Sequence, residues 1–222
     1  MTNGIDRTRT RAAGRRAGVL LAGCAVLAVL CGGVRAQTPD GFVSLFDGTL
    51  KGWVVENTDA GNIRIVDGVL RAEGPAGWLR SERRYQDFAL RVEFRFVTPD
   101  ADSGIFVRVA GDSEFLRGWP NNSYQVQVRN PSTPSRFPPV GGLFRHGMPP
   151  GETDFDEAAA ERLSTGTGVW QTLDVEVAGE RLVARLNGTE VMRAGNISRA
   201  SGYIGIQGET GAVEYRAIAI RE

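Results

Sequence analysis

The sequence predicts an all-β domain of the sandwich or barrel class, and three observations support this prediction. Short runs in which apolar and polar residues alternate recur from Gly41 to the C-terminus. The dipeptides Asp67-Gly68 and Asn187-Gly188 each separate two such runs, as in β-hairpins with type I′ turns. Windows with the apolar period of a helix are few. Roughly a dozen short strands in one chain then indicate packed sheets or a closed barrel.

Residues 1–36 are interpreted as an export signal. Arginines precede the apolar run 17–33, and Val34-Arg35-Ala36 is typical of a cleavage site, so the mature chain would begin near Gln37. Two alternatives stay open. Leu21-Ala22-Gly23-Cys24 resembles a lipoprotein box with a lipidated cysteine, and about 18 apolar residues approach the length of a membrane anchor. We expect an exported protein, periplasmic or extracellular, that contacts a membrane only through this leader.

Residues 37–222 are expected to form a single domain. Both cysteines, Cys24 and Cys31, lie in the leader, so this domain has no disulfide and depends on its apolar core. Without the leader's six arginines and one aspartate, 20 basic and 25 acidic side chains remain. This mildly acidic balance argues against nucleic acid or an anionic membrane surface as a partner.

Alternation and turn residues place the strands of this domain. In residues 88–96, five apolar side chains share one face and charged side chains occupy the other. Trp53, Trp78 and Trp170 lie at or in apolar runs and are predicted core residues. The predicted strands are residues 62–66, 69–72, 88–96, 103–109, 123–129, 142–145, 170–177, 183–186, 190–192, 202–207 and 212–220.

Residues 130–168 interrupt the strand pattern. Six of the ten prolines lie here, and a connection this long is usually functional or disordered. Residues 153–163 predict a short helix with Thr153 or Asp154 as its N-cap. Because prolines reduce the entropy lost on ordering, we expect an ordered flap over one mouth of the fold. This flap contains the only histidine, His146.

Two strands carry a polar face opposite a regular apolar face. Strand 123–129 alternates Tyr124, Val126 and Val128 with Gln125, Gln127 and Arg129. In strand 103–109, Phe106 and Arg108 lie opposite Ser103, Ile105, Val107 and Val109. We predict that these polar faces converge on a shared hollow, so that Arg108, Gln125 and Gln127 line one site.

Seven segments occur in a recognisable order: GFVSLFDGTLKGW (41–53), IVDGVLRAEGPAGWLRSE (65–82), DFALRVEFRF (87–96), DSGIFVR (102–108), NSYQVQV (122–128), VARLNGTEV (183–191) and GYIGIQGETGAVEYRAIAI (202–220). Together they resemble the bacterial 3-keto-disaccharide hydrolase family. The resemblance implies a concanavalin A-like jelly-roll sandwich of two curved antiparallel sheets, a sugar site on the concave sheet, and cleavage of glycosides with a ketone at C3. Two positions depart from the family pattern: Asp102 stands at a usual asparagine and Gln125 at a usual glutamate.

A ketone at C3 makes the C2 proton acidic, so the reaction needs a base near C2 and a donor at the C3 oxygen. Arg108 is predicted to hold the enolate, with a surface ion pair as the alternative role. His146 is a candidate base or leaving-group acid because its ordinary pKa is nearest neutrality. Glu209 is a candidate for the carboxylate that Gln125 lacks. The alternative for His146 is a loop histidine without a catalytic role, and the alternative for Glu209 is a turn residue in a salt bridge.

The amides of Gln125 and Gln127 are predicted to bind sugar hydroxyls, since each both donates and accepts; an ordinary solvent-facing strand is the alternative. Trp119 lies in a loop bounded by Gly and Pro, where its indole can stack on a pyranose ring. The predicted substrate-binding set is completed by Tyr124, Arg145 and Asp102.

Asp102 is also a candidate ligand for a divalent cation, although a role in the turn before its strand is favoured. No zinc or EF-hand spacing is present, so a cation is suggested by the resemblance alone and no other cofactor is expected.

The sequence therefore predicts an exported hydrolase of 3-keto-glycosides, with a keto-sugar as its partner. Its cleft would lie between strands 103–109 and 123–129 under the 130–168 flap. Two rivals stay open. One is a non-catalytic carbohydrate-binding module, which Gln125 favours; the other is an adhesion or scaffold domain, which an anchored leader would suit.

Overall fold

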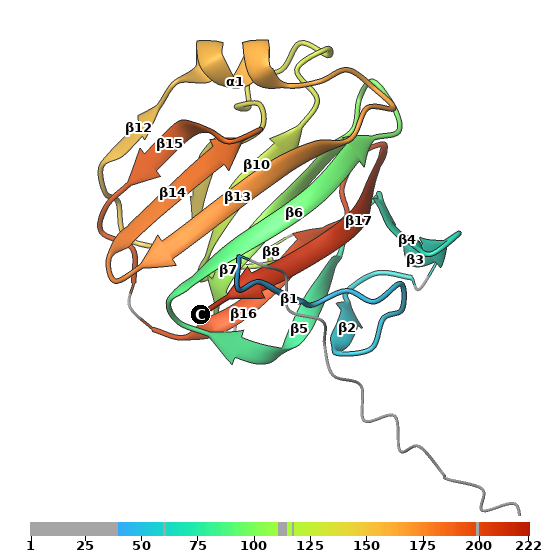
Figure 1. Cartoon of the computed structure of the whole chain (residues 1–222), viewed down its shortest axis with the longest axis horizontal. Coiled ribbons are helices and arrows are strands. Elements are labelled where there is room, and N and C mark those ends of the chain that lie inside the picture. Colours follow the sequence, from blue (N-terminus) through green and yellow to red (C-terminus); the bar gives the residue numbers. More distant parts are fainter. Residues whose placement is uncertain (1–39, 60, 111–114, 117, 199) are drawn as a thin grey trace, which may run out of the picture. The chain divides into compact units, whose positions relative to one another are not determined.

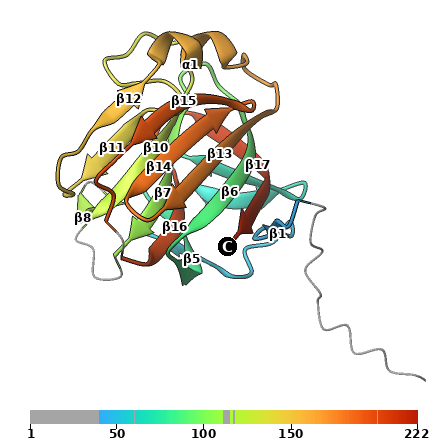
Figure 2. The ribbon, with the colours of Figure 1, turned by 60° about the vertical axis from the view of Figure 1, so that its left-hand side comes forward.

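Two antiparallel sheets dominate the computed structural model (Figures 1 and 2). It describes residues 40–222 apart from positions 60, 111–114, 117 and 199. The expected leader, with its cleavage site and lipoprotein box, lies outside these residues. Within them, no helix is long and apolar enough to cross a membrane.

The large sheet comprises β1 (Val43–Ser44), β3 (Ile63–Val66), β4 (Val69–Glu73), β6 (Phe88–Phe96), β12 (Thr153–Phe155), β13 (Gln171–Ala178), β14 (Arg181–Leu186), β15 (Thr189–Ala194) and β17 (Ala212–Arg221). The small sheet comprises β2 (Trp53–Glu56), β5 (Trp78–Tyr85), β7 (Asp102–Val109), β10 (Ser123–Arg129), β11 (Leu143–His146) and β16 (Gly202–Gln207). A separate pair is formed by β8 (Phe115–Leu116) and β9 (Trp119–Pro120).

Strand order shows how distant segments meet. The large sheet runs β12-β15-β14-β13-β6-β17-β4-β3, with β1 beside β17, and the small sheet runs β11-β10-β7-β16-β5-β2. Thus β7 lies between β10 and β16, which come from different parts of the chain. This arrangement brings three sequence-distant strands to one place on the small sheet.

The two predicted hairpins are confirmed. Asp67 and Gly68 join β3 to β4 with φ of 52° and 77°, and Asn187 and Gly188 join β14 to β15 with φ of 50° and 82°. A type I′ turn requires positive φ at both central residues, which aspartate, asparagine and glycine tolerate.

Apolar side chains from both sheets form the core. The five apolar residues of β6 are all buried, which confirms the predicted alternation. From the small sheet, the apolar face of β10 and Ile105 and Val107 of β7 join the same cluster. The opposite face of β10 therefore points away from the core between the sheets.

The three tryptophans predicted to lie in the core differ in burial. Trp53 is buried in the main core, and Trp78 is buried in a second cluster that includes Phe106. Trp170 is only half-buried, and the guanidinium groups of Arg95 and Arg216 lie 4.6 and 4.7 Å from the centre of its ring. The prediction for Trp170 is wrong, because this residue precedes β13 and packs against cationic side chains.

The 130–168 segment divides into several parts. β11 joins the edge of β10, whereas Thr153–Phe155 form β12 on the edge of β15. The helix, α1 (Glu157–Leu163), therefore begins later than predicted, and Asp156 is its N-cap, accepting from the backbone N–H of Ala159 at 2.9 Å. Strand pairing of residues 153–155 overrides their helical preference. Since α1 lies against β15, the segment is not one continuous roof over the small sheet (Figure 2).

Arg129 holds the first part of this segment to β10. It is only 7% exposed, and its guanidinium donates to the carbonyl oxygens of Asn130, Thr133 and Pro138 at 2.9–3.1 Å. Backbone bonds from Gln127 continue the attachment at residues 141 and 142. Residues 130–142 are thus attached to the strand that carries the two predicted glutamines.

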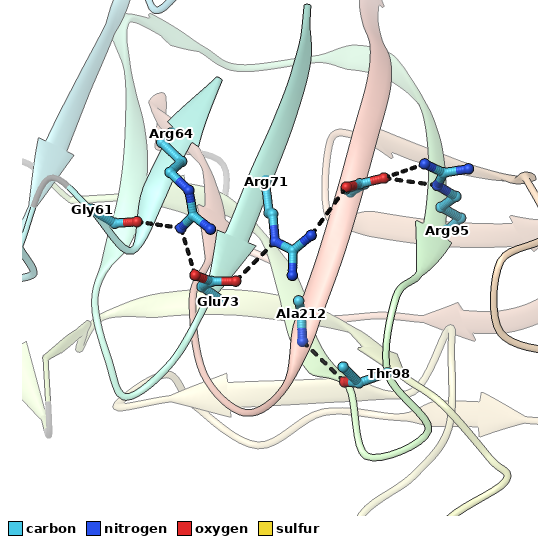
Figure 3. A network of polar contacts seen from close by, with 8 residues as sticks. Gly61, Arg64, Arg71, Glu73, Arg95, Thr98 and Ala212 are labelled. Carbon is cyan, nitrogen blue, oxygen red and sulfur yellow. Dashed lines mark hydrogen bonds and ion pairs between the residues drawn. The ribbon is translucent and has the colours of Figure 1, made fainter. Parts of the chain in front are cut away.

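Ion pairs cross the outer face of the large sheet (Figure 3). Glu73 of β4 binds Arg64 at 2.5 Å and Arg71 at 2.9 Å, and hydrogen bonds with both lower the pKa of Glu73. Glu214 of β17 lies between Arg71, at 3.4 Å, and Arg95 of β6, at 2.6 Å. The side chain of Glu214 is only 8% exposed. These two ion pairs therefore connect β17 to β4 and β6 in a partly dehydrated setting.

Candidate active site

A hollow of about 120 Å³ lies on the face of the small sheet that points away from the main core. Six of the nine predicted site residues line it, while Arg108, Tyr124 and Arg145 do not. The full lining is Asp102, Trp119, Gln125, Gln127, Phe137, Phe144, His146, Gln207 and Glu209.

Backbone contacts bring Asp102 and Glu209 together. The N–H of Asp102, at the start of β7, donates to the carbonyl oxygen of Thr210 at 2.8 Å, and the N–H of Thr210 donates back at 3.3 Å. This bridge folds the loop after β16 onto β7. A side chain at Gly74 would collide with the backbone carbonyl of Glu209, so glycine permits the close approach of the neighbouring turn.

Three glutamine side chains connect the carboxyl groups. Gln125 Nε2 donates to Gln127 Oε1 at 2.7 Å and to Gln207 Oε1 at 2.9 Å. Gln127 Nε2 donates to Asp102 Oδ1 at 2.8 Å, and the Gln207 side chain lies near enough to Glu209 to lower the pKa of that carboxyl group. All three glutamines are at most 3% exposed, so these amides are buried in the hollow instead of lying on a solvent-facing strand.

Gly104 of β7 makes room for this network. It is the partner of Gln127 in the β7–β10 ladder, and a Cβ at position 104 would lie only 2.6 Å from Cγ of Gln125. Glycine therefore lets the Gln125 side chain lie directly across β7. Any larger residue would displace that side chain.

Burial changes the acidity of both carboxyl groups. It raises the pKa of Asp102 to about 6, against the opposing effects of Arg129 and of hydrogen bonds from the Ser103 N–H and Gln127. Burial, and then the nearby charge of Asp102, raise the pKa of Glu209 to about 7. Glu209 therefore exchanges its proton near neutral pH.

His146 lies in a partly buried aromatic setting. Its ring stacks on Phe144, with centroids 5.9 Å apart, and lies 6.0 Å from the ring of Phe106. Burial lowers the pKa of His146, so the ring is neutral at neutral pH. Its Nε2 lies 2.7 Å from Oε1 of Gln125, which connects it to the amide network.

The structure contradicts the predicted position of Arg108. Its guanidinium is fully buried and forms an ion pair with Asp87 at 2.7 Å. It also donates to the backbone oxygens of Gln86, Gly179 and Ser198. These partners belong to turns and loops away from the hollow, so Arg108 does not share a site with the glutamines.

A β-bulge explains this error. Arg108 has a φ of 51°, and between Phe106 and Val109 the register with β16 shifts by one residue. The extra residue reverses the alternation, so Val109 packs in the same small cluster as Phe106 instead of facing the main core. A period-two pattern therefore fails beyond Val107.

Tyr124 and Arg145 have structural contacts in place of the predicted substrate contacts. Tyr124 is fully buried in the main core, and its hydroxyl accepts from the N–H of Ser198 at 2.7 Å. Arg145 points to the opposite face of β11 from His146 and donates to backbone oxygens that include Gly195, at 2.6 Å. The alternation that placed Tyr124 among apolar side chains was the better guide to its position.

Sequence reasoning missed three lining residues, Gln207, Phe144 and Phe137. Gln207 ends an apolar strand two residues before Glu209, a polar signal that could have been read. Phe144 alternates with Arg145 and faces the hollow with His146. Phe137 is 41% exposed at the rim, where its ring contacts Phe144 edge to face at 6.0 Å. No local pattern in the Pro-rich segment indicates that position.

Metal ligation is not supported by the residues described in the structure. Among them, no group of three or more His, Cys, Asp or Glu side chains is arranged to hold a metal ion. Asp102 instead accepts from Gln127. The described side chains around this hollow therefore do not form a ligand set for a resident cation.

A wider hollow of about 780 Å³ lies along β13, β14 and β15 of the large sheet. Four of its charged side chains are paired with one another: Arg185 contacts Glu176 at 3.1 Å and Glu190 at 3.5 Å, and Arg193 contacts Glu190 at 2.5 Å. None of the predicted site residues lines it. The smaller hollow, with its buried and titratable groups, is therefore the candidate active site.

Several solved structures share this fold. A candidate glycosyl hydrolase from Parabacteroides distasonis has a TM-score of 0.64 at 16% identity, covering 84% of this chain and 98% of its own. A second from that organism has a TM-score of 0.61 at 20% identity, covering 82% and 98%. A carbohydrate-binding module from Bacillus subtilis has a TM-score of 0.54 at 12% identity, covering 77% and 96%. These similarities confirm the predicted jelly-roll β-sandwich.

The comparison with family models is more specific. No curated protein matches the chain. The model of the 3-keto-alpha-glucoside-1,2-lyase-like domain, however, matches residues 41–221, a range that contains every strand of both sheets and the whole candidate site. The resemblance carried by the seven segments is thereby confirmed, and the chain belongs to the 3-keto-alpha-glucoside-1,2-lyase-like domain family.

Proposed function

We propose that this protein cleaves glycosides whose sugar carries a ketone at C3, by elimination between C1 and C2. The observation that carries the proposal is the meeting of two oppositely shifted groups in one hollow. The pKa of Glu209 is raised to about 7 and that of His146 is lowered. Such a pair provides a proton donor and a proton acceptor at the same pH. The family description supports the substrate class.

In the proposed reaction, the neutral His146 removes the proton from C2, which the adjacent ketone acidifies. The C–H electron pair forms the enolate and then the C1=C2 double bond, while the bond from C1 to the leaving oxygen breaks. Protonated Glu209 donates its proton to that oxygen. The products are an alcohol and an unsaturated keto-sugar, and addition of water across C1=C2 would complete hydrolysis.

The size of the hollow suggests which part of a substrate lies inside it and which part lies at its rim. Its volume of about 120 Å³ is below the roughly 300–1,000 Å³ typical of ligand pockets, so a disaccharide would extend beyond it. We place the keto-sugar ring inside, near the glutamines and Trp119, and the leaving sugar against the exposed Phe137. Because the leader resembles an export signal, we propose that the reaction takes place outside the cytoplasm.

The direct test is to incubate the purified protein with 3-keto-trehalose and to measure glucose release. Trehalose without the ketone is the matched control, and it should not be cleaved because its C2 proton is not acidified. His146→Gln should abolish release from the keto-sugar. Absence of turnover by the unaltered protein, with and without added divalent metal, would contradict the proposal.

One observation favours a second function, a non-catalytic carbohydrate-binding module. Gln125, Gln127 and Gln207 line the hollow with uncharged amide groups, and an amide at position 125 suits recognition of a sugar without acid–base chemistry there. Calorimetric binding of a keto-sugar with no product after long incubation would favour this alternative over the enzyme.

A further inference from the structure

We propose that Gln125 is a positioning residue that holds His146 with a proton on Nε2, leaving Nδ1 free to accept a proton from the substrate. The role in catalysis rests on the proposed function. The protonation pattern itself follows from the direction of the hydrogen bonds in the hollow.

The direction is determined first at Asp102. An ionised carboxylate only accepts hydrogen bonds, so Gln127, 2.8 Å away, must present its NH₂ group to Asp102. The carbonyl oxygen of Gln127 then faces Gln125 at 2.7 Å. That oxygen also only accepts, so Gln125 must present its own NH₂ group to Gln127.

The contact between Gln125 and Gln207 gives the same direction through a second arm. The Gln207 carbonyl oxygen accepts from Gln125 Nε2 at 2.9 Å, so the NH₂ group of Gln207 remains for Glu209, whose pKa the Gln207 side chain lowers. The two hydrogens of Gln125 Nε2 therefore match two carbonyl oxygens, one on each arm. Because the arms agree, turning the Gln125 amide over would break both bonds at once.

Only Oε1 of Gln125 remains for His146. A carbonyl oxygen cannot donate, so the ring nitrogen at 2.7 Å, Nε2, must carry a hydrogen. In a neutral ring the other nitrogen, Nδ1, then has a free lone pair. Stacking on Phe144 restrains the plane of the ring, so the network determines both its orientation and its proton.

The same geometry explains why an amide fits at position 125. A glutamate there would present oxygen to the carbonyl oxygens of Gln127 and Gln207, with no hydrogen between them. Both amides would have to turn over and direct their carbonyl oxygens at Asp102 and Glu209, and each of those carboxyl groups would then need a proton. Gln125 is thus matched to its neighbours and is not merely a lost carboxylate.

Nitrogen NMR tests this inference without any substrate. His146 is the only histidine in the chain, so ¹⁵N-histidine labelling of the full chain, carrying a histidine-free tag, gives one pair of ring signals. In the unaltered protein at neutral pH we expect a protonated Nε2 and an unprotonated Nδ1. A protonated Nδ1 with a bare Nε2 would overturn the proposal.

Gln125→Lys is the decisive variant, because an ammonium group can donate to Gln127, Gln207 and His146 but cannot accept. We expect the tautomer to invert, with the proton moving to Nδ1. An unchanged tautomer in this folded variant would overturn the role of Gln125. Gln125→Met, which keeps the length and removes the acceptor, serves if the lysine variant does not fold. In this variant the Nε2–H of His146 has lost its acceptor and should exchange with solvent faster than in the unaltered protein. Unchanged exchange would equally contradict the proposal.

These readouts are separate from turnover. A protein with the expected tautomer but no cleavage of keto-sugars would contradict the proposed function and leave the positioning inference standing. Cleavage of keto-sugars by a protein with the opposite tautomer would support the proposed function and contradict the positioning inference.

Discussion

At the scale of single residues, the surroundings give different pKa values to two carboxyl groups, those of Asp102 and Glu209. Asp102 accepts a hydrogen bond from Gln127 and lies in the field of Arg129, which holds its pKa nearer to the ordinary range. Glu209 is raised further, to a pKa of about 7, by burial and by the charge of Asp102. The first is suited to orienting the network and the second to moving a proton.

Glu209→Gln tests the proton-donating role. The variant keeps the size and polarity of the side chain but cannot donate an acidic proton, so we expect kcat to fall by about 10²- to 10⁴-fold. In the unaltered enzyme, kcat/KM should fall as pH rises through about 7, where Glu209 loses its proton. The variant should lack this alkaline limb, as pH–rate profiles will show. Glu82→Gln, exposed and outside the hollow, is the control and should retain the limb.

At the scale of elements, strand pairing and bulges decide which side chains meet. The bulge in β7 directs Arg108 to Asp87 and to backbone oxygens, where it joins turns instead of binding a ligand. On the large sheet, Glu214 connects β17 to its two neighbours, β4 and β6. The charged side chains of Arg108 and Glu214 therefore connect parts of the fold to one another.

Glu214→Gln should destabilise the protein by about 1–3 kcal/mol, because it removes the charge that neutralises Arg71 and Arg95 in a partly buried pair. Urea unfolding measures the change. Glu176→Gln is the control, since Glu176 is half exposed in its pair with Arg185 and should cost below about 0.5 kcal/mol. Equal losses in the two variants would argue against a special role for Glu214.

The rim formed by residues 130–142 has its own test at Phe137. If the leaving sugar packs against this exposed ring, Phe137→Ala should raise KM for a 3-keto-disaccharide about 2- to 10-fold and leave kcat nearly unchanged. Phe137→Tyr keeps the ring and should behave like the unaltered enzyme. Steady-state kinetics will distinguish these outcomes, and an unchanged KM in the alanine variant would remove Phe137 from the site.

At the scale of the whole molecule, the hollow should lower stability at neutral pH. Asp102 and Glu209 bind protons more tightly when folded, with pKa values of about 6 and 7 against 3.8 and 4.5 ordinarily. Their contribution therefore favours the folded state at acid pH and is lost as pH rises through this range. Allowing for solvent screening and mutual coupling, the loss between pH 4 and 8 is roughly 3 kcal/mol.

Urea unfolding at several pH values checks this contribution by comparison with Asp102→Asn/Glu209→Gln. The free energy of unfolding of the double variant should rise relative to that of the unaltered protein as pH increases from 4 to 8. Other acids, such as Glu73 with its lowered pKa, act in the opposite direction, but they are common to both proteins. Parallel pH profiles would contradict the raised pKa values.

Much of the fold could be predicted because its signals are local. The alternation in β6 and the turn residues Asp67-Gly68 and Asn187-Gly188 depend on backbone preferences within a few residues. The seven segments likewise led to the family. Of the candidate site, the polar face of β10 was predictable for the same reason, as were Asp102, His146 and Glu209 as residues with suitable chemistry.

The amino-acid sequence alone was enough to predict a jelly-roll domain with glutamines, carboxyl groups and one histidine in its loops and strands. Which of these side chains meet depends on how the strands pair and pack. The bulge in β7 directs Arg108 away from the hollow, and the bridge between Asp102 and Thr210 places Glu209 at the hollow. Gln207 joined because β16 and β10 flank the same strand. Local periodicity specifies which way a side chain points along its own strand, whereas the partners it reaches depend on register and packing between distant segments.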